Sequence, residues 1–479
     1  MFVGLDLGTS GLKGLVIDTT GRVRAEASAP LQVSRPHPGW SEQDPAQWIT
    51  AAETVLRALA EQIDVGLISG IGLSGQMHGA TVLDRADRVL RPCILWNDTR
   101  ASAQAAKLDA DIRFRRISGN IVFPGFTAPK LAWMADEEPE LFAQVAHVLL
   151  PKDYLRLWLT GDHVAEMSDA AGTSWLDVGQ RDWSDDLLGA TGLGREHMPS
   201  LVEGSAPSGT LRPAIAQAFG LRAGIPVAGG AGDNAATAIG LGIARAGQGF
   251  VSLGTSGVLF AATDSYAPAP DTAVHTFCHA LPDTWHQMGV ILAAADALNW
   301  FAALAGSSAA ELTADMGSLQ SPGRTLFLPY LGGERTPLND AAIRGAFLGL
   351  EHATDRMAAT RAVMEGVVFA LLDCQRALAA TGTRIDTLIA AGGGARSDYW
   401  LSALATALEL QIHLPEAGDY GAALGAARLG LMAASDMDMH AMPLPPIARS
   451  IDPVIDKTQA FQDGYARYRQ AQTAIKELS

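Results

Sequence analysis

A repeated five-residue unit constrains the fold of this chain more than any other feature. The sequence LGTSG occupies residues 7–11 and recurs at residues 253–257. Each copy follows one short apolar run and precedes another, which predicts a strand, a glycine turn and a second strand. A chain of 479 residues exceeds what one hydrophobic core usually supports, and one copy opens each half. We therefore expect two related domains, residues 1–242 and 243–479.

Helix and strand signals alternate along both halves, which is typical of an α/β protein. Asp44 and Pro45 supply an N-cap and a first-turn proline, and Ser397 begins another helix after a strand over residues 387–391. The most apolar internal stretch, residues 290–304, is predicted as a core helix that is too short to span a bilayer.

Charge and composition narrow the class of partners. The formal net charge is −16, and no block of basic residues is present. We expect no binding to nucleic acid or to a membrane, because both depend on clustered Lys and Arg. Cys93, Cys278 and Cys374 are far apart and lack metal-ligand spacing. They predict buried free thiols in a reducing, cytoplasmic compartment.

The first glycine turn predicts a phosphate site. Gly8 leaves backbone N–H groups open to an anion, and the hydroxyls of Thr9 and Ser10 add hydrogen-bond donors. Asp6, at the end of the preceding strand, can hold Mg²⁺ directly or through water. An ordinary hairpin turn with a capping aspartate is the alternative interpretation of a single copy.

The second copy favours the phosphate interpretation. Gly254, Thr255 and Ser256 repeat the cradle, so two turns could clamp the phosphates of one nucleotide from opposite sides. Ser252 stands where Asp6 stands in the first copy. Only the first half therefore supplies a carboxylate.

A glycine run after the strand at residues 387–391 predicts a further part of the nucleotide site. Gly393, Gly394 and Ala395 lie just before a helix N-terminus, where a base or ribose can rest against bare backbone. The chain has neither a GxxxxGK[ST] loop nor a GxGxxG loop. ATP must therefore be held by a different architecture.

Asp233 is the candidate general base. It lies in a glycine-rich segment, residues 229–234, between a strand-like and a helix-like run. A hydroxyl that accepts a phosphoryl group needs a carboxylate to orient it and to take its proton. A helix N-cap is the alternative role, but a cap does not require backbone this exposed.

Motifs spread over nearly the whole chain carry a family resemblance. They are GLDLGTS at 4–10, WSEQDP at 40–45, GQMHG at 75–79, LWND at 95–98, PKDY at 151–154, MSDAAGT at 167–173, GDN at 232–234 and GGERTP at 332–337. Together they resemble the FGGY family of carbohydrate kinases. The resemblance implies two actin-like, ribonuclease H-like ATPase domains with the nucleotide in a cleft between them. One departure is Ala358, where the family usually has a polar residue; Asp355 is predicted to cap that helix instead.

The resemblance also implies roles for individual residues. Asp233 would be the general base, and Asp6 would hold magnesium and phosphate, with both carboxylates near the metal. The implied sugar ligands are Gln76, Met77, His78, Trp96, Asn97, Asp98 and Asn234. By themselves, a lone histidine is more often structural and a methionine or tryptophan more often core.

The implied activity is transfer of the γ-phosphoryl group of MgATP to a hydroxyl of a small sugar. We expect D-xylulose as the acceptor, giving D-xylulose 5-phosphate, with ribulose, glycerol and gluconate as alternatives. An actin-like ATPase that switches a protein partner would share the fold, since fold does not imply function. Such a protein would not need the polar residues at 76–79 and 232–234. The expected partners are a sugar and ATP, and a homodimer is left open.

Overall fold

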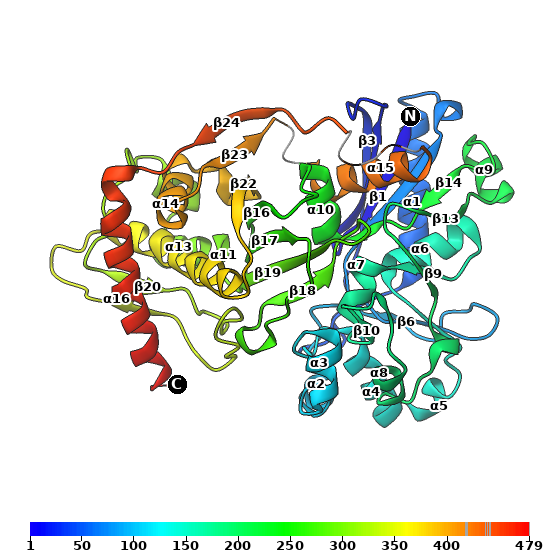
Figure 1. The fold of residues 1–479 in the computed structure, drawn as a ribbon, viewed down its shortest axis with the longest axis horizontal. Helices are drawn as coiled ribbons and strands as arrows, with labels where there is room; N and C mark the ends of the chain where they lie inside the picture. The colour runs from blue at the N-terminus through cyan, green and yellow to red at the C-terminus, as the bar shows by residue number, and fades with distance from the viewer. Residues whose placement is uncertain (417–419, 436, 438, 440–441, 479) are drawn as a thin grey trace.

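The computed structural model describes residues 1–416, 420–435, 437, 439 and 442–478. Each half is built around a seven-stranded sheet, and the two sheets lie side by side (Figure 1). The first contains β1 (Phe2–Leu7), β2 (Gly11–Ile17), β3 (Val23–Pro30), β5 (Gly70–Gly75), β13 (Pro207–Thr210), β14 (Pro226–Ala228) and β15 (Ala231–Gly232). The second contains β16 (Gly247–Leu253), β17 (Gly257–Thr263), β18 (His275–Cys278), β19 (Trp285–Ile291), β22 (Ile385–Ala391), β23 (Ile412–Pro415) and β24 (Ile447–Ile451).

The two sheets share one topology, as the repeated sequence predicts. The strand order is β3-β2-β1-β5-β14-β13 in the first and β19-β17-β16-β22-β23-β24 in the second, where β18 adds an edge. β1 and β16 each pair antiparallel with the strand after the glycine turn and parallel with a later strand. Each LGTSG unit therefore forms the same hairpin at the centre of its sheet.

Helices and small sheets cover and connect these two layers. The helices of the first half are α1 (Pro45–Ala60), α2 (Ser102–Asp109), α3 (Ile112–Ser118), α4 (Thr127–Glu137), α5 (Pro139–Phe142), α6 (Pro151–Thr160), α7 (Met167–Ala170), α8 (Asp185–Gly189), α9 (Pro213–Phe219) and α10 (Asp233–Leu241). Those of the second half are α11 (Ala295–Leu304), α12 (Ala309–Thr313), α13 (Arg356–Ala380), α14 (Asp398–Leu408), α15 (Gly421–Ala433) and α16 (Thr458–Lys476). The short strands are β4 (Glu42–Gln43), β6 (Thr81–Leu83), β7 (Cys93–Ile94), β8 (His147–Leu149), β9 (Val164–Glu166), β10 (Leu176–Asp177), β11 (Asp182–Trp183), β12 (Ser200–Val202), β20 (Leu326–Leu328) and β21 (Ala346–Leu348).

The two halves meet where α15 packs on the first sheet and on α10. A Cβ atom at Gly72 would lie 1.8 Å from the carbonyl oxygen of Ala426, and one at Gly425 would lie 1.7 Å from that of Ala236. These glycines are required because the backbones touch at these points. α15 follows the second glycine turn in the sequence, yet it covers the sheet that carries the first (Figure 1).

Local signals predict most helix starts but not the transition after β19. Asp44 caps α1, Ser397 caps α14, and Asp355 caps α13 by accepting from the N–H of Ala358. The prediction of one helix over residues 290–304 is wrong, because β19 continues to Ile291 and α11 begins only at Ala295. β19 is hydrogen-bonded to strands on both sides, and a short buried strand has no periodicity that separates it from a buried helix.

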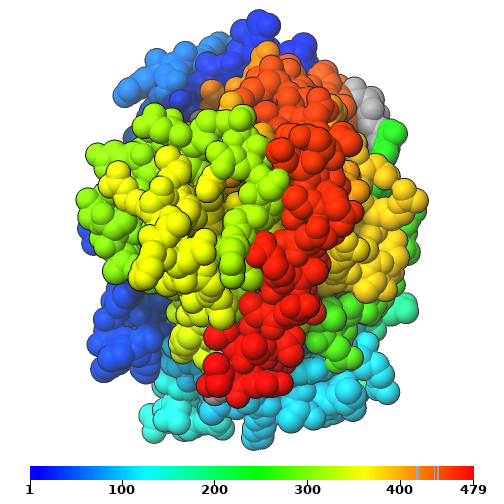
Figure 2. Space-filling model, turned by 90° about the vertical axis from the view of Figure 1, so that its left-hand side faces the viewer, coloured from blue at the N-terminus to red at the C-terminus, as the bar shows by residue number. Residues whose placement is uncertain are grey.

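The outer face of the second half is closed by α16, which runs across it in Figure 2. Phe461 and Tyr468 on this helix are buried in the second core, and the Tyr468 hydroxyl lies 2.7 Å from that of Tyr330. Among the described helices, none combines the length and apolarity needed to cross a membrane.

Candidate active site

Asp6 and Asp233 emerge at the same edge of the first sheet. β1 and β15 both pair in parallel with β5, and Asp6 and Ala231 are both level with Ser74. Asp233 directly follows β15, so its carboxyl group lies near Asp6. Burial and the neighbouring charge of Asp233 raise the pKa of Asp6 to about 6. Oδ1 of Asp6 is buried and accepts no hydrogen bond from the described residues, which leaves it open to a cation.

Asp233 is the first residue of α10 rather than its cap, because Gly232 holds the cap position. Its Oδ1 accepts from the backbone N–H of Asn234 at 2.7 Å and from the Asn234 side-chain amide at 3.0 Å. Burial raises the pKa of Asp233, although these hydrogen bonds oppose the shift. The carboxyl group is thus fixed through one oxygen, with the other oriented away from these donors.

Lys13 is a charged residue of this edge that the sequence interpretation missed. It lies on β2 directly opposite Asp6, and its positive charge favours the ionised form of that carboxyl group. Its ammonium group also lies 5.0 Å from the ring centre of Tyr420 in the second half. A lone lysine in the otherwise apolar strand GLKGLVI is the signal that could have identified it.

The first glycine turn is joined to predicted sugar residues by hydrogen bonds. The Thr9 hydroxyl donates to Oε1 of Gln76 at 2.9 Å and accepts from Nε1 of Trp96 at 3.0 Å. The Gln76 amide donates in turn to Gln43, whose amide donates to the Thr9 carbonyl oxygen. Gln76 is buried, whereas 48% of the Trp96 surface is exposed. Trp96 therefore presents a ring to solvent while it is held beside Thr9.

His78 has a fixed tautomer and directly follows Met77, which packs against the segment that carries Asp233. Its Nδ1 lies 2.7 Å from the carbonyl oxygen of Gly172, so Nδ1 carries the proton and Nε2 is a free acceptor. The ring stacks on Phe126 at 4.5 Å, and burial lowers the pKa of His78 to about 3. A Cβ at Gly232 would lie 2.9 Å from the Met77 side chain, so Met77 packs directly against the backbone before Asp233.

Two predicted sugar residues occupy contrasting environments. Asp98 is 2% exposed, and its oxygens accept from the backbone N–H of Ser41 and from the guanidinium of Arg100. Its observed contacts are those of a structural ion pair, and its contact with a sugar stays a prediction. Asn97 is exposed, as a ligand-binding amide must be before substrate arrives.

The second glycine turn and the glycine run at residues 392–394 form one surface. A Cβ at Gly392 would lie 3.2 Å from the backbone nitrogen of Gly254, and one at Gly394 would lie 2.7 Å from Cβ of Leu253. Thr255 and Ser256 are exposed. Ala395 is buried beneath this surface.

A pocket of about 390 Å³ opens beside this surface. Its lining comes from α11, α12, the glycine run and α14, and comprises Ala295, Leu298, Asn299, Ala309, Ala310, Thr313, Gly393, Gly394, Arg396, Ser397 and Trp400. The walls are mostly small and apolar, with a few polar groups, as ligand pockets usually are. Sequence reasoning identified the glycines but missed two other lining residues. Asn299 is distant from the glycines in the sequence, and Arg396, two residues after Gly394, belongs to no motif.

A buried ion cluster supports the segment that carries Asp233. The Lys152 ammonium lies 2.7 Å from Asp153, 3.3 Å from Glu166 and 3.1 Å from Asp169, and all four side chains have no exposed surface. Burial, with Asp153 and Glu166 nearby, raises the pKa of Asp169 well above its usual range, although the Lys152 ammonium opposes the shift.

This cluster contacts the segment before Asp233 at two points. Arg156, ion-paired to Asp153, donates to the carbonyl oxygen of Gly229. The backbone N–H of Gly232 donates to the hydroxyl of Ser168 at 3.1 Å. Residues 229–232 are therefore held from below by α6 and α7.

Arg335 brings a positive charge from the second half toward Phe123 and His78 of the first half. Its guanidinium lies 4.7 Å from the ring centre of Phe123, and Nη1 is 3.4 Å from Nε2 of His275. Its charge also helps to lower the pKa of His78. Sequence reasoning quoted the GGERTP motif but gave Arg335 no role.

Comparisons with known proteins agree with this architecture. Family models match at residues 1–240 (FGGY family of carbohydrate kinases, N-terminal domain) and 249–434 (C-terminal domain). Xylulose kinase of Escherichia coli (strain K12) is 47% identical over 474 residues, which are 98% of each chain. A crystal structure described as a "xyloylose kinase" from Brucella ovis is 58% identical, with a TM-score of 0.98 over 100% of both chains.

A more distant structure tests the fold alone. Plasmodium falciparum glycerol kinase with ADP superimposes with a TM-score of 0.90 at 18% identity, over 99% of this chain and 97% of that one. The expected two-domain, actin-like α/β fold is confirmed. The chain belongs to the FGGY family of carbohydrate kinases and is a carbohydrate kinase.

Proposed function

We propose that this kinase transfers the γ-phosphoryl group of MgATP to D-xylulose, giving D-xylulose 5-phosphate, with Asp233 as general base. The observation that carries the proposal is the pairing of Asp233 with Asp6 at one sheet edge, next to a neutral His78. The acceptor is supported by the relatives named xylulose kinase at 47% and 48% identity.

In this proposal Asp233 takes the proton of the acceptor hydroxyl as its oxygen attacks the γ-phosphorus. The bond from that phosphorus to the bridging oxygen breaks, and ADP leaves. The bond from Oδ1 to Asn234 keeps the carboxyl group in one orientation, so little reorganisation is needed.

The sugar would lie against residues of the first half. Nε2 of His78 can accept a hydrogen bond from a sugar hydroxyl, because the Gly172 carbonyl oxygen keeps the ring proton on Nδ1. Met77 and Trp96 offer apolar surface, and Asn97, Asn234 and Gln76 offer amides. Asp98 is the least accessible member of the proposed set, because its oxygens are already bonded.

The nucleotide would lie between the glycine turns, with its phosphates toward Gly8, Thr9 and Ser10 on one side and Gly254, Thr255 and Ser256 on the other. Its base and ribose would occupy the pocket beside Gly393 and Gly394, above Ala395. Mg²⁺, when bound, would neutralise phosphate charge during transfer. Asp6 is the carboxylate suited to hold it, with Asp233 nearby, since Oδ1 of Asp6 has no hydrogen-bond partner among the residues that the structure describes.

Two broader proposals accompany this one. We retain domains 1–242 and 243–479, which are supported by the gap between the matched family models at residues 240 and 249. A reducing, cytoplasmic location is supported by Cys93, Cys278 and Cys374, which are free and buried.

Asp233→Asn tests the base directly. The amide keeps the shape of the side chain but cannot take a proton, so we expect kcat to fall by roughly 10²–10⁴-fold with ATP binding retained. Asp185→Asn is the matched control, because Asp185 is the first residue of α8, a helix that carries no proposed site residue. Wild-type turnover in Asp233→Asn would remove this residue from the mechanism.

A substrate panel tests the acceptor separately. Rates of ADP formation with D-xylulose, D-ribulose, glycerol and gluconate should give the highest kcat/KM for D-xylulose. A higher value for another acceptor would replace D-xylulose without affecting the role of Asp233. ATP turnover that no sugar accelerates would favour an actin-like ATPase instead.

A further inference from the structure

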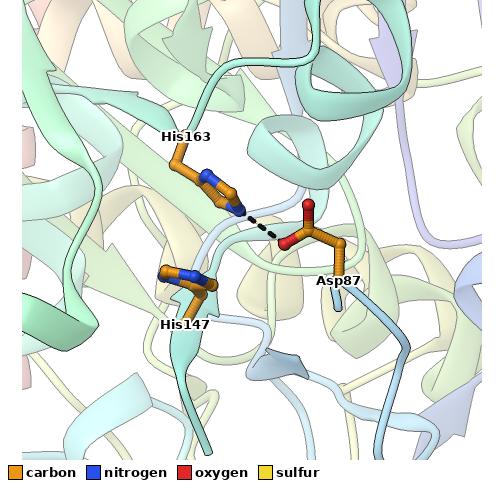
Figure 3. Close-up of side chains that lie close together, drawn as sticks. All are labelled: Asp87, His147 and His163. Atoms are coloured by element: carbon orange, nitrogen blue, oxygen red, sulfur yellow. Dashed lines mark hydrogen bonds and ion pairs between the residues drawn. The ribbon is translucent and has the colours of Figure 1, made fainter. Parts of the chain in front are cut away.

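Three potential metal ligands meet on the first half, in a cluster that supplies no proposed site residue. Asp87 lies in the turn between β6 and β7, His147 begins β8, and His163 lies in the loop between α6 and β9. Their ligand atoms lie within 4.8 Å of one another. Figure 3 shows the His163 ring directed at the Asp87 carboxylate, with the His147 ring beside the His163 ring.

The geometry already brings two of these ligands into contact. Nε2 of His163 lies 2.8 Å from Oδ1 of Asp87, and the rings of His147 and His163 stack at 4.1 Å. A tetrahedral ion with bonds of about 2.0–2.2 Å needs ligand atoms roughly 3.5 Å apart. The widest spacing must therefore close by about 1 Å and the rings must tilt apart. The side chains of Asp87 and His163 are 45% and 28% exposed, so both have room to turn.

The backbone that carries these side chains is held in place. His147 pairs with Leu83 across β6 and β8, and the N–H of Asp87 donates to Asp84 in its turn. The carbonyl oxygen of His163 accepts from the N–H of Ser200. Only side-chain rotation separates the observed arrangement from a chelating one.

We propose that Asp87, His147 and His163 form a binding site for a divalent cation of the Zn²⁺ class. Two imidazoles and one carboxylate suit Zn²⁺, Co²⁺, Ni²⁺ or Cu²⁺, whereas Mg²⁺ and Ca²⁺ prefer oxygen ligands throughout. The site therefore differs in chemistry from the proposed magnesium position at Asp6. Water would complete the coordination of the ion.

The bound ion would join three segments that are separate in the sequence. One of them follows α6, the helix whose Lys152 and Arg156 support the backbone before Asp233. An ion that binds the folded chain and not the unfolded chain raises the melting temperature, by an amount that grows with the free ion concentration relative to Kd. The site is thus a structural clip on the first half.

Calorimetric titration of the chelator-treated full chain with Zn²⁺, in saturating Mg²⁺, tests this proposal. We expect one Zn²⁺ per chain and a higher melting temperature with Zn²⁺ present. His163→Ala and Asp87→Asn should each weaken binding at least tenfold and remove the thermal shift. His352→Ala is the matched control, because His352 is exposed and remote in sequence from the cluster.

Binding of Co²⁺ supplies an independent readout. Visible absorption typical of four- or five-coordinate Co²⁺ should appear in the wild type and be lost in the double variant His147→Ala, His163→Ala. Absence of Zn²⁺ binding, or stoichiometry unchanged in the double variant, would overturn the proposal. The cluster would then be only a hydrogen-bonded histidine–aspartate pair beside a second histidine.

Discussion

The two glycine turns occupy equivalent places in two sheets of the same order, yet their surroundings differ sharply. In the first, Asp6 lies opposite Lys13, so a negative and a positive side chain precede and follow the turn. In the second, the equivalent pair is Ser252 and Val258, neither of which is charged. The same scaffold is therefore charged in one half and neutral in the other.

The packing next to the proposed site residues also differs between the two halves, being ionic in the first and uncharged in the second. In the first half, the segment at residues 229–234, which carries Asp233, rests on the buried ions of α6 and α7. The second turn rests on apolar packing and on bare backbone at Gly392 and Gly394. The duplicated fold therefore has ionic groups at the edge that carries Asp6 and Asp233 and apolar packing with bare backbone around the second turn. This difference fits the proposed division into a half that supplies reactive groups and a half that holds the nucleotide.

Paired substitutions at the equivalent strand positions should give the largest difference. Asp6→Asn removes the carboxylate proposed for magnesium, so we expect kcat/KM to fall by roughly 10²–10³-fold, with a weakened response to Mg²⁺. Ser252→Ala should change kcat/KM by less than about threefold, because no charge is lost. Rates measured over a range of Mg²⁺ concentrations check both values, and equal losses would show that the halves are not chemically distinct.

Asp6→Asn should also make the protein more stable at neutral pH. The folded-state pKa of Asp6 is raised to about 6, so the ionised form costs stability above that pH. We expect the free energy of unfolding to rise by roughly 1–3 kcal/mol at pH 7.5. The gain should shrink as pH falls from about 6 toward 4, where native Asp6 is already protonated. Urea unfolding at pH 7.5 and 4.5 measures this, and a gain that does not depend on pH would contradict the pKa shift.

Substitutions in the buried cluster test the support of the first half. Lys152→Met leaves Glu166 and Asp169 without their buried cation and leaves Asp153 with Arg156 alone, so we expect a loss of about 3–5 kcal/mol in the free energy of unfolding. Asp169→Asn should cost less than about 1 kcal/mol, because burial already opposes the ionised form of Asp169 and raises its pKa. Denaturant unfolding at pH 7 compares the two variants. Equal losses would mean that Asp169 is ionised in the native state.

The repeated unit allowed two related domains with matching hairpins to be predicted, because a glycine turn between apolar strands depends only on local sequence. The actin-like fold was implied by the family resemblance. The same holds for the caps at Asp44, Asp355 and Ser397. The end of β19 was not predictable, because its limits are set by strands that are distant in the sequence. Periodicity within one segment carries no information about such partners.

The candidate site was predictable where a motif marks it and not where tertiary packing creates it. Asp6 and Asp233 stand out beside glycines, and their closeness follows from parallel pairing with β5. Asn299 has no such marker, and Arg335 lies in a quoted motif that by itself does not show which residues it meets. Each reaches its position through the fold of the second half. The family resemblance implied Asp98 as a sugar ligand. In the fold, Arg100 two residues later donates to both oxygens of Asp98, and the contact of Asp98 with a sugar stays a prediction.

The smallest predicted effects are those of alanine substitutions at two neighbouring glycines of the second half. A Cβ at Gly394 would lie 2.7 Å from Cβ of Leu253 and 3.1 Å from its carbonyl oxygen, whereas one at Gly393 meets no atom within 4 Å. Gly394→Ala must therefore push against the second glycine turn, and we expect a loss of about 1–3 kcal/mol in stability. Gly393→Ala should leave stability within about 0.5 kcal/mol of wild type.

The KM for ATP is a second measurement that separates these two variants. Gly393 lines the pocket beside α11 and α14, so its new methyl group would enter space proposed for the nucleotide. We expect Gly393→Ala to raise KM for ATP severalfold with KM for the sugar unchanged. A stable Gly393→Ala enzyme with wild-type KM for ATP would move the nucleotide away from this pocket. It would also remove the main reason to regard the second half as the nucleotide surface, since the neutral turn at Gly254 offers no charge to hold a ligand in its place.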